Sequence, residues 1–153
     1  MVVRSTLLLL VPFCLLVSAD SASVRSESLP DPALTPGATL PVTARDVCVV
    51  GYTKTVRDVP AALKREVYRS YGREPDRGRC CEVDHLISLE LGGSNDRKNL
   101  WPQRYDGEWN AARKDRLERR LHAMVCHGEI SLTTAQEAIA HDWITAYLRF
   151  VVR

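Results

Sequence analysis

An aspartate and a histidine stand side by side in a largely apolar stretch, which reads CEVDHLISLELGGSNDRKNLW from Cys81 to Trp101. The imidazole of His85, with an unperturbed pKa of about 6.5, can accept a proton from water at neutral pH. The carboxylate of Asp84 is an oxygen ligand of the kind that hard divalent cations bind. A Gly-Gly pair and an Asn-Leu pair follow across the expected turn. These residue types fit a hydrolytic site, and they also fit a buried, hydrogen-bonded hairpin.

The elements that position Asp84 and His85 are expected from apolar spacing and turn residues. Residues 45–59 are rich in β-branched side chains and predict one or two short strands. Pro60 favours the start of a helix that ends at Gly72. A polar loop over 73–79 leads into the strand, turn and strand of the opening stretch.

Two further helices are expected after the hairpin. The first covers about 107–126, where apolar residues recur at helical spacing and Gly128 supplies the stop. The second begins at Thr133, where Gln136 stands three residues after a threonine cap. The order is strand, strand, helix, with polar groups in each piece.

The chain of 153 residues carries 21 Lys+Arg against 19 Asp+Glu, a balance that neither requires nor excludes a polyanionic partner. Residues 1–19 combine Arg4, an apolar run over 7–17 and small residues, which predicts a cleaved signal peptide. Residues 20–44 are rich in Ser, Pro, Gly and Ala and predict a flexible leader. We expect one domain over 45–153, secreted or periplasmic and without stable membrane association.

Four cysteines remain after the expected cleavage: Cys48, Cys80, Cys81 and Cys126. An even number in an exported chain predicts two disulfides. Because a ring between adjacent cysteines is strained, we expect Cys80 and Cys81 each to reach a distant partner, most simply Cys48 and Cys126. A zinc site that includes Cys126 and His127 is the competing interpretation, although no paired CxxC spacing supports it.

The segment from Glu82 to about Asp115 resembles the HNH endonucleases, also known as ββα-metal nucleases. Their motif runs Asp-His, Gly-Gly and Asn-Leu, followed by polar residues on the next helix. The resemblance implies an α+β fold with a ββα-metal core, to which the elements expected above add flanking helices and a short N-terminal β segment. It implies a metal-dependent endonuclease that hydrolyses phosphodiester bonds, and the expected signal peptide would make this enzyme a secreted one.

The resemblance also implies roles for individual residues. His85 matches the general base and Asp84 a metal ligand, while Asn110 matches the second ligand, on the helix. Asn99 matches the asparagine of the catalytic motif that fixes the hairpin loop. Carboxylate and amide oxygens suit a divalent ion, most simply Mg²⁺. The CxxC pairs that hold a structural zinc in many members are missing, and disulfides would provide the restraint instead.

The strand geometry raises a difficulty for this assignment. Adjacent residues of a regular strand point to opposite faces, whereas the mechanism needs Asp84 and His85 around one phosphate. We therefore expect the backbone to bend there. The amide of Asn99 is suited to hold such a bend by bonding main-chain groups of the turn.

Basic residues near the motif are candidates for contact with nucleic acid, with DNA favoured over RNA. They lie in the turn and on the following helix, and comprise Arg97, Lys98, Arg113 and Lys114. The alternative is that this charge run is a solvated helix face.

Structural alternatives also stay open for the other candidate residues. His85 could be a core histidine, Asp84 a turn cap and Asn110 a helix N-cap. At the level of the whole chain, the alternatives are a non-catalytic nucleic-acid-binding or interaction module on the same ββα frame and a disulfide-stabilised structural domain.

Overall fold

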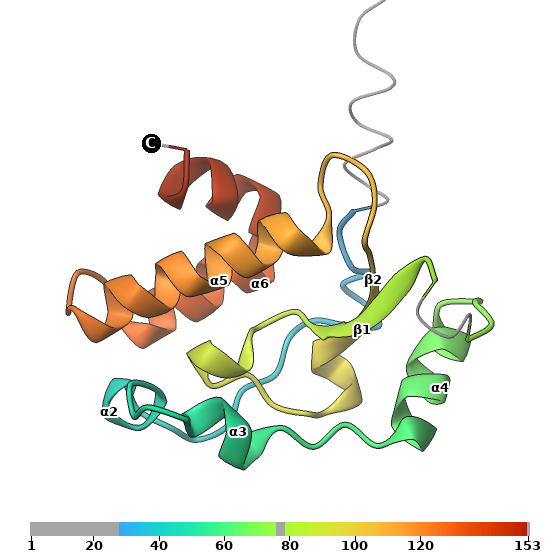
Figure 1. Cartoon of the computed structure of the whole chain (residues 1–153), viewed down its shortest axis with the longest axis horizontal. Helices are drawn as coiled ribbons and strands as arrows, with labels where there is room; N and C mark the ends of the chain where they lie inside the picture. Colours follow the sequence, from blue (N-terminus) through green and yellow to red (C-terminus); the bar gives the residue numbers. More distant parts are fainter. Residues whose placement is uncertain (1–27, 76–78, 153) are drawn as a thin grey trace, which may run out of the picture.

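The computed structural model describes residues 28–75 and 79–152. A β-hairpin lies between two long helices on one side and a shorter helix on the other (Figure 1). In chain order, the elements are α2 (Ala44–Val47), α3 (Tyr52–Val56), α4 (Ala61–Ser70), β1 (Cys81–His85), two 3-10 turns (Leu89–Leu91 and Arg97–Asn99), β2 (Leu100–Arg104), α5 (Ala111–Cys126) and α6 (Leu132–Phe150). The mixed α+β class expected from the sequence is confirmed at this level.

The two strands form an antiparallel pair with an unbroken register from Cys81 to His85. The bend that we expected between Asp84 and His85 is therefore absent. Because side chains alternate along a strand, Asp84 shares a face with Glu82, and His85 belongs to the opposite face. The regular pairing prevails because β1 can keep all its main-chain bonds to β2 without a bulge.

The loop between the strands is held by Asn99, as its place in the sequence suggested. Its Oδ1 accepts the N–H of Ile87 at 2.9 Å, and its Nδ2 donates to the carbonyls of Ile87 and Ser94, each at 2.9 Å. Gly93 is required here, because a Cβ atom at this position would lie 1.8 Å from the carbonyl oxygen of Ile87. Asn99 is fully buried. It therefore supports the loop and does not itself reach a substrate.

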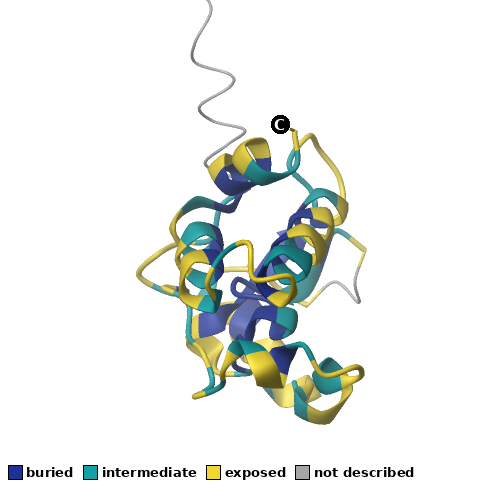
Figure 2. Ribbon diagram, turned by 90° about the vertical axis from the view of Figure 1, so that its left-hand side faces the viewer, coloured by how far each residue is buried: buried dark blue, intermediate teal, exposed yellow. Residues whose placement is uncertain are grey.

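The hydrophobic core lies between α5, α6 and the hairpin loop, and the inner faces of the helices are buried (Figure 2). Leu117 and Leu121 of α5 and Ile139 and Trp143 of α6 are completely buried. Burial of such side chains typically stabilises a fold by about 1.5–3 kcal/mol each. Within the described part of the chain, no helix has the length and apolar character needed to cross a membrane.

The last helix begins slightly earlier than expected and bends in the middle. Ser131, not Thr133, is the N-cap, and its Oγ accepts the N–H of Thr134 at 3.0 Å. Asp142 has non-helical backbone angles, and its Oδ1 accepts the N–H groups of Ile144 and Thr145, both at 3.0 Å. The aspartate thus caps the second half of α6.

The prediction of short strands over 45–59 is wrong, because this segment forms the helices α2 and α3. The N–H of Thr43 donates to the Asp46 carboxylate at 2.7 Å, which caps the start of α2. Val47 is buried in the core, and Cys48 is bonded to α5. Tertiary contacts and capping override the weak β preference of the valines and threonines here.

Part of the expected flexible leader packs on the hairpin loop. The N–H of Leu40 donates to the carbonyl of Gly92 at 2.8 Å, and the N–H of Ser94 donates to that of Ala38 at 2.9 Å. Thr35 is buried. Residues 28–43 therefore make specific contacts with the domain. The expected signal peptide over 1–19 and the leader residues 20–27 lie outside the described residues.

The cysteines form two disulfides, but not in the expected pairing. Cys48 is bonded to Cys126 across 78 positions of the sequence, and the adjacent Cys80 and Cys81 are bonded to each other. The fold brings α2 to the end of α5, with the Cα atoms of Cys48 and Cys126 5.6 Å apart. Both distant partners are thereby used, which leaves Cys80 and Cys81 with one another.

Candidate active site

His85 ends β1 as a buried side chain with only 4% of its surface exposed. Its Nε2 lies 2.9 Å from Oδ1 of Asn95, and Nδ2 of Asn95 donates to the carbonyl of Val56 at 2.6 Å. Because the amide nitrogen donates to Val56, the amide oxygen faces the ring and accepts a hydrogen bond from the Nε2–H group. The arrangement thus selects the tautomer with the proton on Nε2 and a lone pair on Nδ1.

Nδ1 of His85 has no hydrogen-bond partner in residues 28–75 and 79–152. It is also not among the fully buried polar atoms that lack a partner, which belong to Tyr52, Trp101 and Gln103. Nδ1 is therefore the ring nitrogen that remains as a hydrogen-bond acceptor. Asn95 was missed by the sequence analysis, because an asparagine in a polar loop carries no spacing signal that links it to the histidine.

Burial is the main cause that lowers the pKa of His85 below its ordinary value, and the charges of Arg57 and Lys114 act in the same direction. The hydrogen bond to Asn95 and the charge of Asp84 oppose this shift and are outweighed. The imidazole is consequently neutral at pH 7, which is the form that accepts a proton.

Lys114 is the central cation beneath the hairpin, and its side chain is completely buried. Its Nζ donates to Oδ2 of Asp84 at 2.7 Å, to the carbonyl of His85 at 2.6 Å and to the Glu118 carboxylate. Three acceptors thus satisfy the three donors of the ammonium group. The ammonium of Lys114 is wholly buried and its donors are used within the fold, so in this structure it offers none to a phosphate.

The electrostatics of this cluster favour a charged lysine. Burial by itself would lower the pKa of Lys114, but the neighbouring Asp84 and Glu118 outweigh it and raise that pKa. Burial raises the pKa of Glu118, and Lys114 opposes that rise. Lys114 ties α5 to the end of β1 and fixes one carboxylate oxygen of Asp84.

Asn110, the second expected metal ligand, is the N-cap of α5. Its Oδ1 accepts the N–H of Arg113 at 3.2 Å, and its Nδ2 donates to the carbonyl of Gly107 at 3.0 Å. The structure therefore gives Asn110 the capping role that the sequence left open as the alternative. It supplies no contact between Asn110 and Asp84.

Glu82 is the acidic side chain that the structure places on the same strand face as Asp84. Burial and then the charge of Asp84 raise the pKa of Glu82. A cation between the two carboxylates would relieve this repulsion. Glu82 was missed as a site residue, although its position two residues before Asp84 was the signal that could have identified it.

Three basic candidates from the sequence remain at the surface. Arg97 and Lys98 are exposed on the 3-10 turn before β2. Arg113 is partly buried, and its guanidinium lies 4.8 Å from the ring centroid of Trp109 and 5.7 Å from that of Tyr147. Arg113 is thus largely engaged in an aromatic contact within the fold.

Within the described residues, one group of three potential metal ligands of the His, Cys, Asp or Glu type is present, formed by Cys48, His122 and Cys126. Their ligand atoms lie within 4.8 Å of one another. The two sulfurs are bonded to each other, so the thiolates that zinc needs are absent while the disulfide stands. His127, the histidine of the zinc alternative, is not part of this group.

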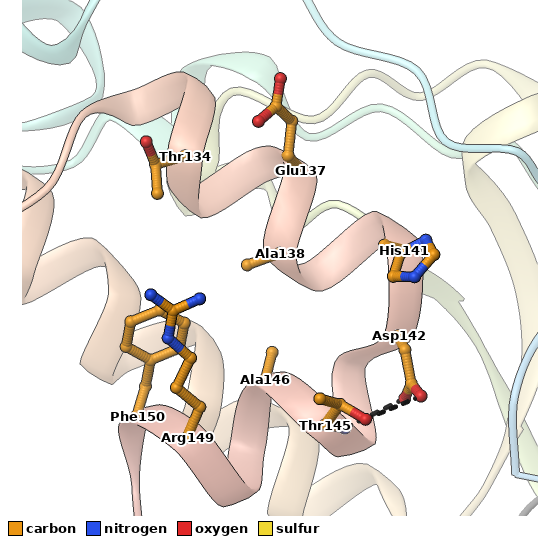
Figure 3. A pocket seen from close by; sticks show the side chains of 9 residues that line it. All are labelled: Thr134, Glu137, Ala138, His141, Asp142, Thr145, Ala146, Arg149 and Phe150. Atoms are coloured by element: carbon orange, nitrogen blue, oxygen red, sulfur yellow. Dashed lines mark hydrogen bonds between the residues drawn. The ribbon is translucent and has the colours of Figure 1, made fainter.

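A cavity of about 290 Å³ lies in the bend of α6, between its two halves (Figure 3). Arg149 and Phe150 stack at one end with 4.8 Å between the guanidinium and the ring centroid, and His141 lies near the bend. The cavity contains none of the site residues expected from the sequence. It is lined by this helix alone and is separate from the His85 site.

Comparisons of this chain with models of protein families, with curated proteins and with solved structures find no match. The functional argument therefore rests on the residues of the chain and on their geometry.

Proposed function

We propose that this chain is an exported, metal-dependent endonuclease of the HNH type that hydrolyses phosphodiester bonds of DNA. The observation that carries the proposal is the state of His85. Its ring is buried, neutral and oriented by Asn95, and Nδ1 has no hydrogen-bond partner among the described residues. The fixed tautomer leaves Nδ1 as the proton acceptor that a general base needs.

The proposed proton transfer uses residues of this chain only. Nδ1 of His85 takes a proton from the attacking water, while the Nε2 proton stays on its hydrogen bond to Asn95. The imidazolium formed in this step is stabilised by the amide oxygen of Asn95 and by the negative charge of Asp84. Because Asn95 is anchored on Val56, the base is oriented before the substrate arrives.

A divalent ion fits the carboxylates of Asp84 and Glu82 better than it fits Asp84 and Asn110. One oxygen of Asp84 is held by Lys114, which leaves the other for a ligand, and Glu82 lies on the same strand face. Because His85 ends β1 and belongs to the opposite face, the phosphate would have to lie across this end of the strand to meet both the ion and the base. Mg²⁺ is bound through one or two carboxylates and keeps several waters for the substrate to displace. When bound, such an ion supplies charge neutralisation at the phosphate and the leaving oxygen.

The second candidate function is a nucleic-acid-binding module without catalysis. The ion pair between Asp84 and Lys114 favours it, because this contact engages an oxygen that the proposed metal would otherwise use. Both candidate functions predict that the chain binds DNA, and only the nuclease predicts that it cleaves DNA.

Plasmid DNA incubated with the purified chain and Mg²⁺ distinguishes these candidates. We expect conversion of supercoiled DNA to nicked and linear forms, and loss of this activity when a chelator removes the ion. A gel-shift measurement runs in parallel on the same sample. A shift without cleavage in any divalent metal would support the binding module and contradict the nuclease.

The export part of the proposal predicts a defined start of the mature protein. The apolar run over 7–17 is about half the ~20 residues that a membrane-spanning helix needs, and small residues follow it. N-terminal sequencing of the secreted protein should therefore find a start near Asp20. Recovery of the chain with Met1 still present would overturn the expected localisation.

A further inference from the structure

A cavity of about 440 Å³ opens beside β1, on the side where the chain enters and forms α4. Three cationic side chains line it: Arg57 from the segment before α4, and Lys64 and Arg65 from α4 itself. Glu82 is the acidic residue in the lining. The charge of the lining is therefore three positive against one negative, or +2, which favours an anion in the cavity.

Within the part of the chain that the structure describes, none of the three cations is ion-paired, although the charge of Arg57 lowers the pKa of the nearby Glu82. In residues 28–75 and 79–152, Arg57, Lys64 and Arg65 form no ion pair and no side-chain hydrogen bond. All three are exposed. Arg104, by contrast, is paired with Asp106 at 2.8 Å. Unpaired cations that converge on one concave surface retain their full capacity to bind phosphate.

Two consecutive residues join the cavity to the His85 site, one by a hydrogen bond to Asn95 and the next by lining the cavity. The carbonyl of Val56 accepts the bond that anchors Asn95, and Asn95 in turn orients His85. Arg57 is the next residue along the chain and lines the cavity. Its positive charge is felt by both His85 and Glu82. Arg57 therefore lines the cavity and is near enough to His85 for its charge to lower the pKa of the imidazole.

We propose that this cavity binds the phosphate backbone of the DNA strand beside the cleaved bond, and that Arg57 contacts the phosphate that His85 acts on. The proposal rests on the proposed function and adds its substrate-binding residues. A guanidinium presents parallel N–H donors that match two phosphate oxygens, whereas a lysine acts as a point charge. Arg57 is thus suited to the reacting phosphate, and Lys64 and Arg65 to its neighbours.

The first test measures DNA binding by fluorescence anisotropy over a range of salt concentrations, in chelator, so that no cleavage occurs. Arg57→Gln and Arg65→Gln should each weaken binding and reduce the slope of log K against log salt by about 1. The matched control is Arg69→Gln, because Arg69 is exposed on the same helix but does not line the cavity. Equal slopes for all three variants and the unmodified chain would overturn the proposal.

The second test separates binding from chemistry. In the presence of Mg²⁺, Arg65→Gln should raise KM and leave kcat nearly unchanged, whereas Arg57→Gln should lower kcat as well. Arg57→Lys should recover the salt slope but not kcat, since it keeps the charge and loses the paired donors. Melting temperatures of all variants establish that they are folded. If Arg57→Lys had the kcat of the unmodified chain, the proposed contact between Arg57 and the reacting phosphate would be wrong.

The two proposals fail in different ways. If the unmodified chain binds DNA with the expected loss in Arg57→Gln but cleaves nothing, the nuclease function is wrong and the cavity remains the binding site. If the chain cleaves DNA and the cavity variants behave like Arg69→Gln, the cavity assignment is wrong and the function stands. A chain that neither binds nor cleaves DNA contradicts both.

Discussion

His85→Ala should lower DNA cleavage by about 10²–10⁴-fold, the contribution typical of a general base, while DNA affinity should stay nearly unchanged. The reason is that the substitution removes Nδ1, the proton acceptor, and leaves the cationic cavity intact. Cleavage, DNA affinity and melting temperature should be measured on the same sample. The substitution leaves the Asn95 amide oxygen without its partner, a penalty of about 1–3 kcal/mol, and also empties the buried space of the ring, so cleavage has to be compared per folded molecule.

The matched variant for this experiment is Asn95→Ala, which keeps the base and removes the group that orients it. Cleavage should fall by less than in His85→Ala, because a freely rotating imidazole still presents Nδ1 to water for part of the time. If the His85→Ala variant were well folded and fully active, the proposed role of His85 as general base would be wrong. A core histidine would show the opposite pattern, with lower stability and unchanged activity per folded molecule.

Lys114→Met should destabilise the fold by about 3–5 kcal/mol, because it removes one partner of a buried ion pair. The substitution removes the ammonium group that donates hydrogen bonds to the carboxylates of Asp84 and Glu118 and to the carbonyl of His85. For a domain of this size, that loss corresponds to a fall in melting temperature of roughly 10–20 °C. Thermal and denaturant unfolding give the two measurements.

The control for this prediction is Arg119→Met, which removes one charge from an exposed position of the same helix. It should change stability by at most about 0.5 kcal/mol. Glu118→Gln added to Lys114→Met removes one of the stranded charges and should restore part of the stability. If Lys114→Met lowered DNA affinity and left stability unchanged, Lys114 would be a phosphate contact after all.

Several elements could be predicted from local sequence because their signals are local. The helix after Pro60 and the helix over about 107–126 follow from apolar periodicity, and the hairpin follows from the paired apolar runs around Gly-Gly. Asn99 was expected to hold the turn, and its amide does so. These features depend on residues that are neighbours in the chain, where propensity and turn chemistry act directly.

Other features were missed because they depend on contacts between distant segments. Residues 45–59 carry a weak β preference, but capping at Asp46 and the disulfide from Cys48 to α5 make the segment helical. Lys114 belongs to a run of cations that resembles a solvated face, yet its position places it under β1. The spacing of residues along a helix predicts which face each residue lies on, but it does not predict which other segment packs against that face.

The sequence by itself determined which residue types this chain can use for chemistry: an aspartate and a histidine at the end of one strand, and an asparagine across the turn. The tertiary structure decided their roles. It joined Asn95 to Val56, which set the tautomer of His85, and it placed Arg57 beside that pair. Protonation and accessibility are properties of an environment built from residues far apart in the chain. For that physical reason, they emerge only when the segments are packed together.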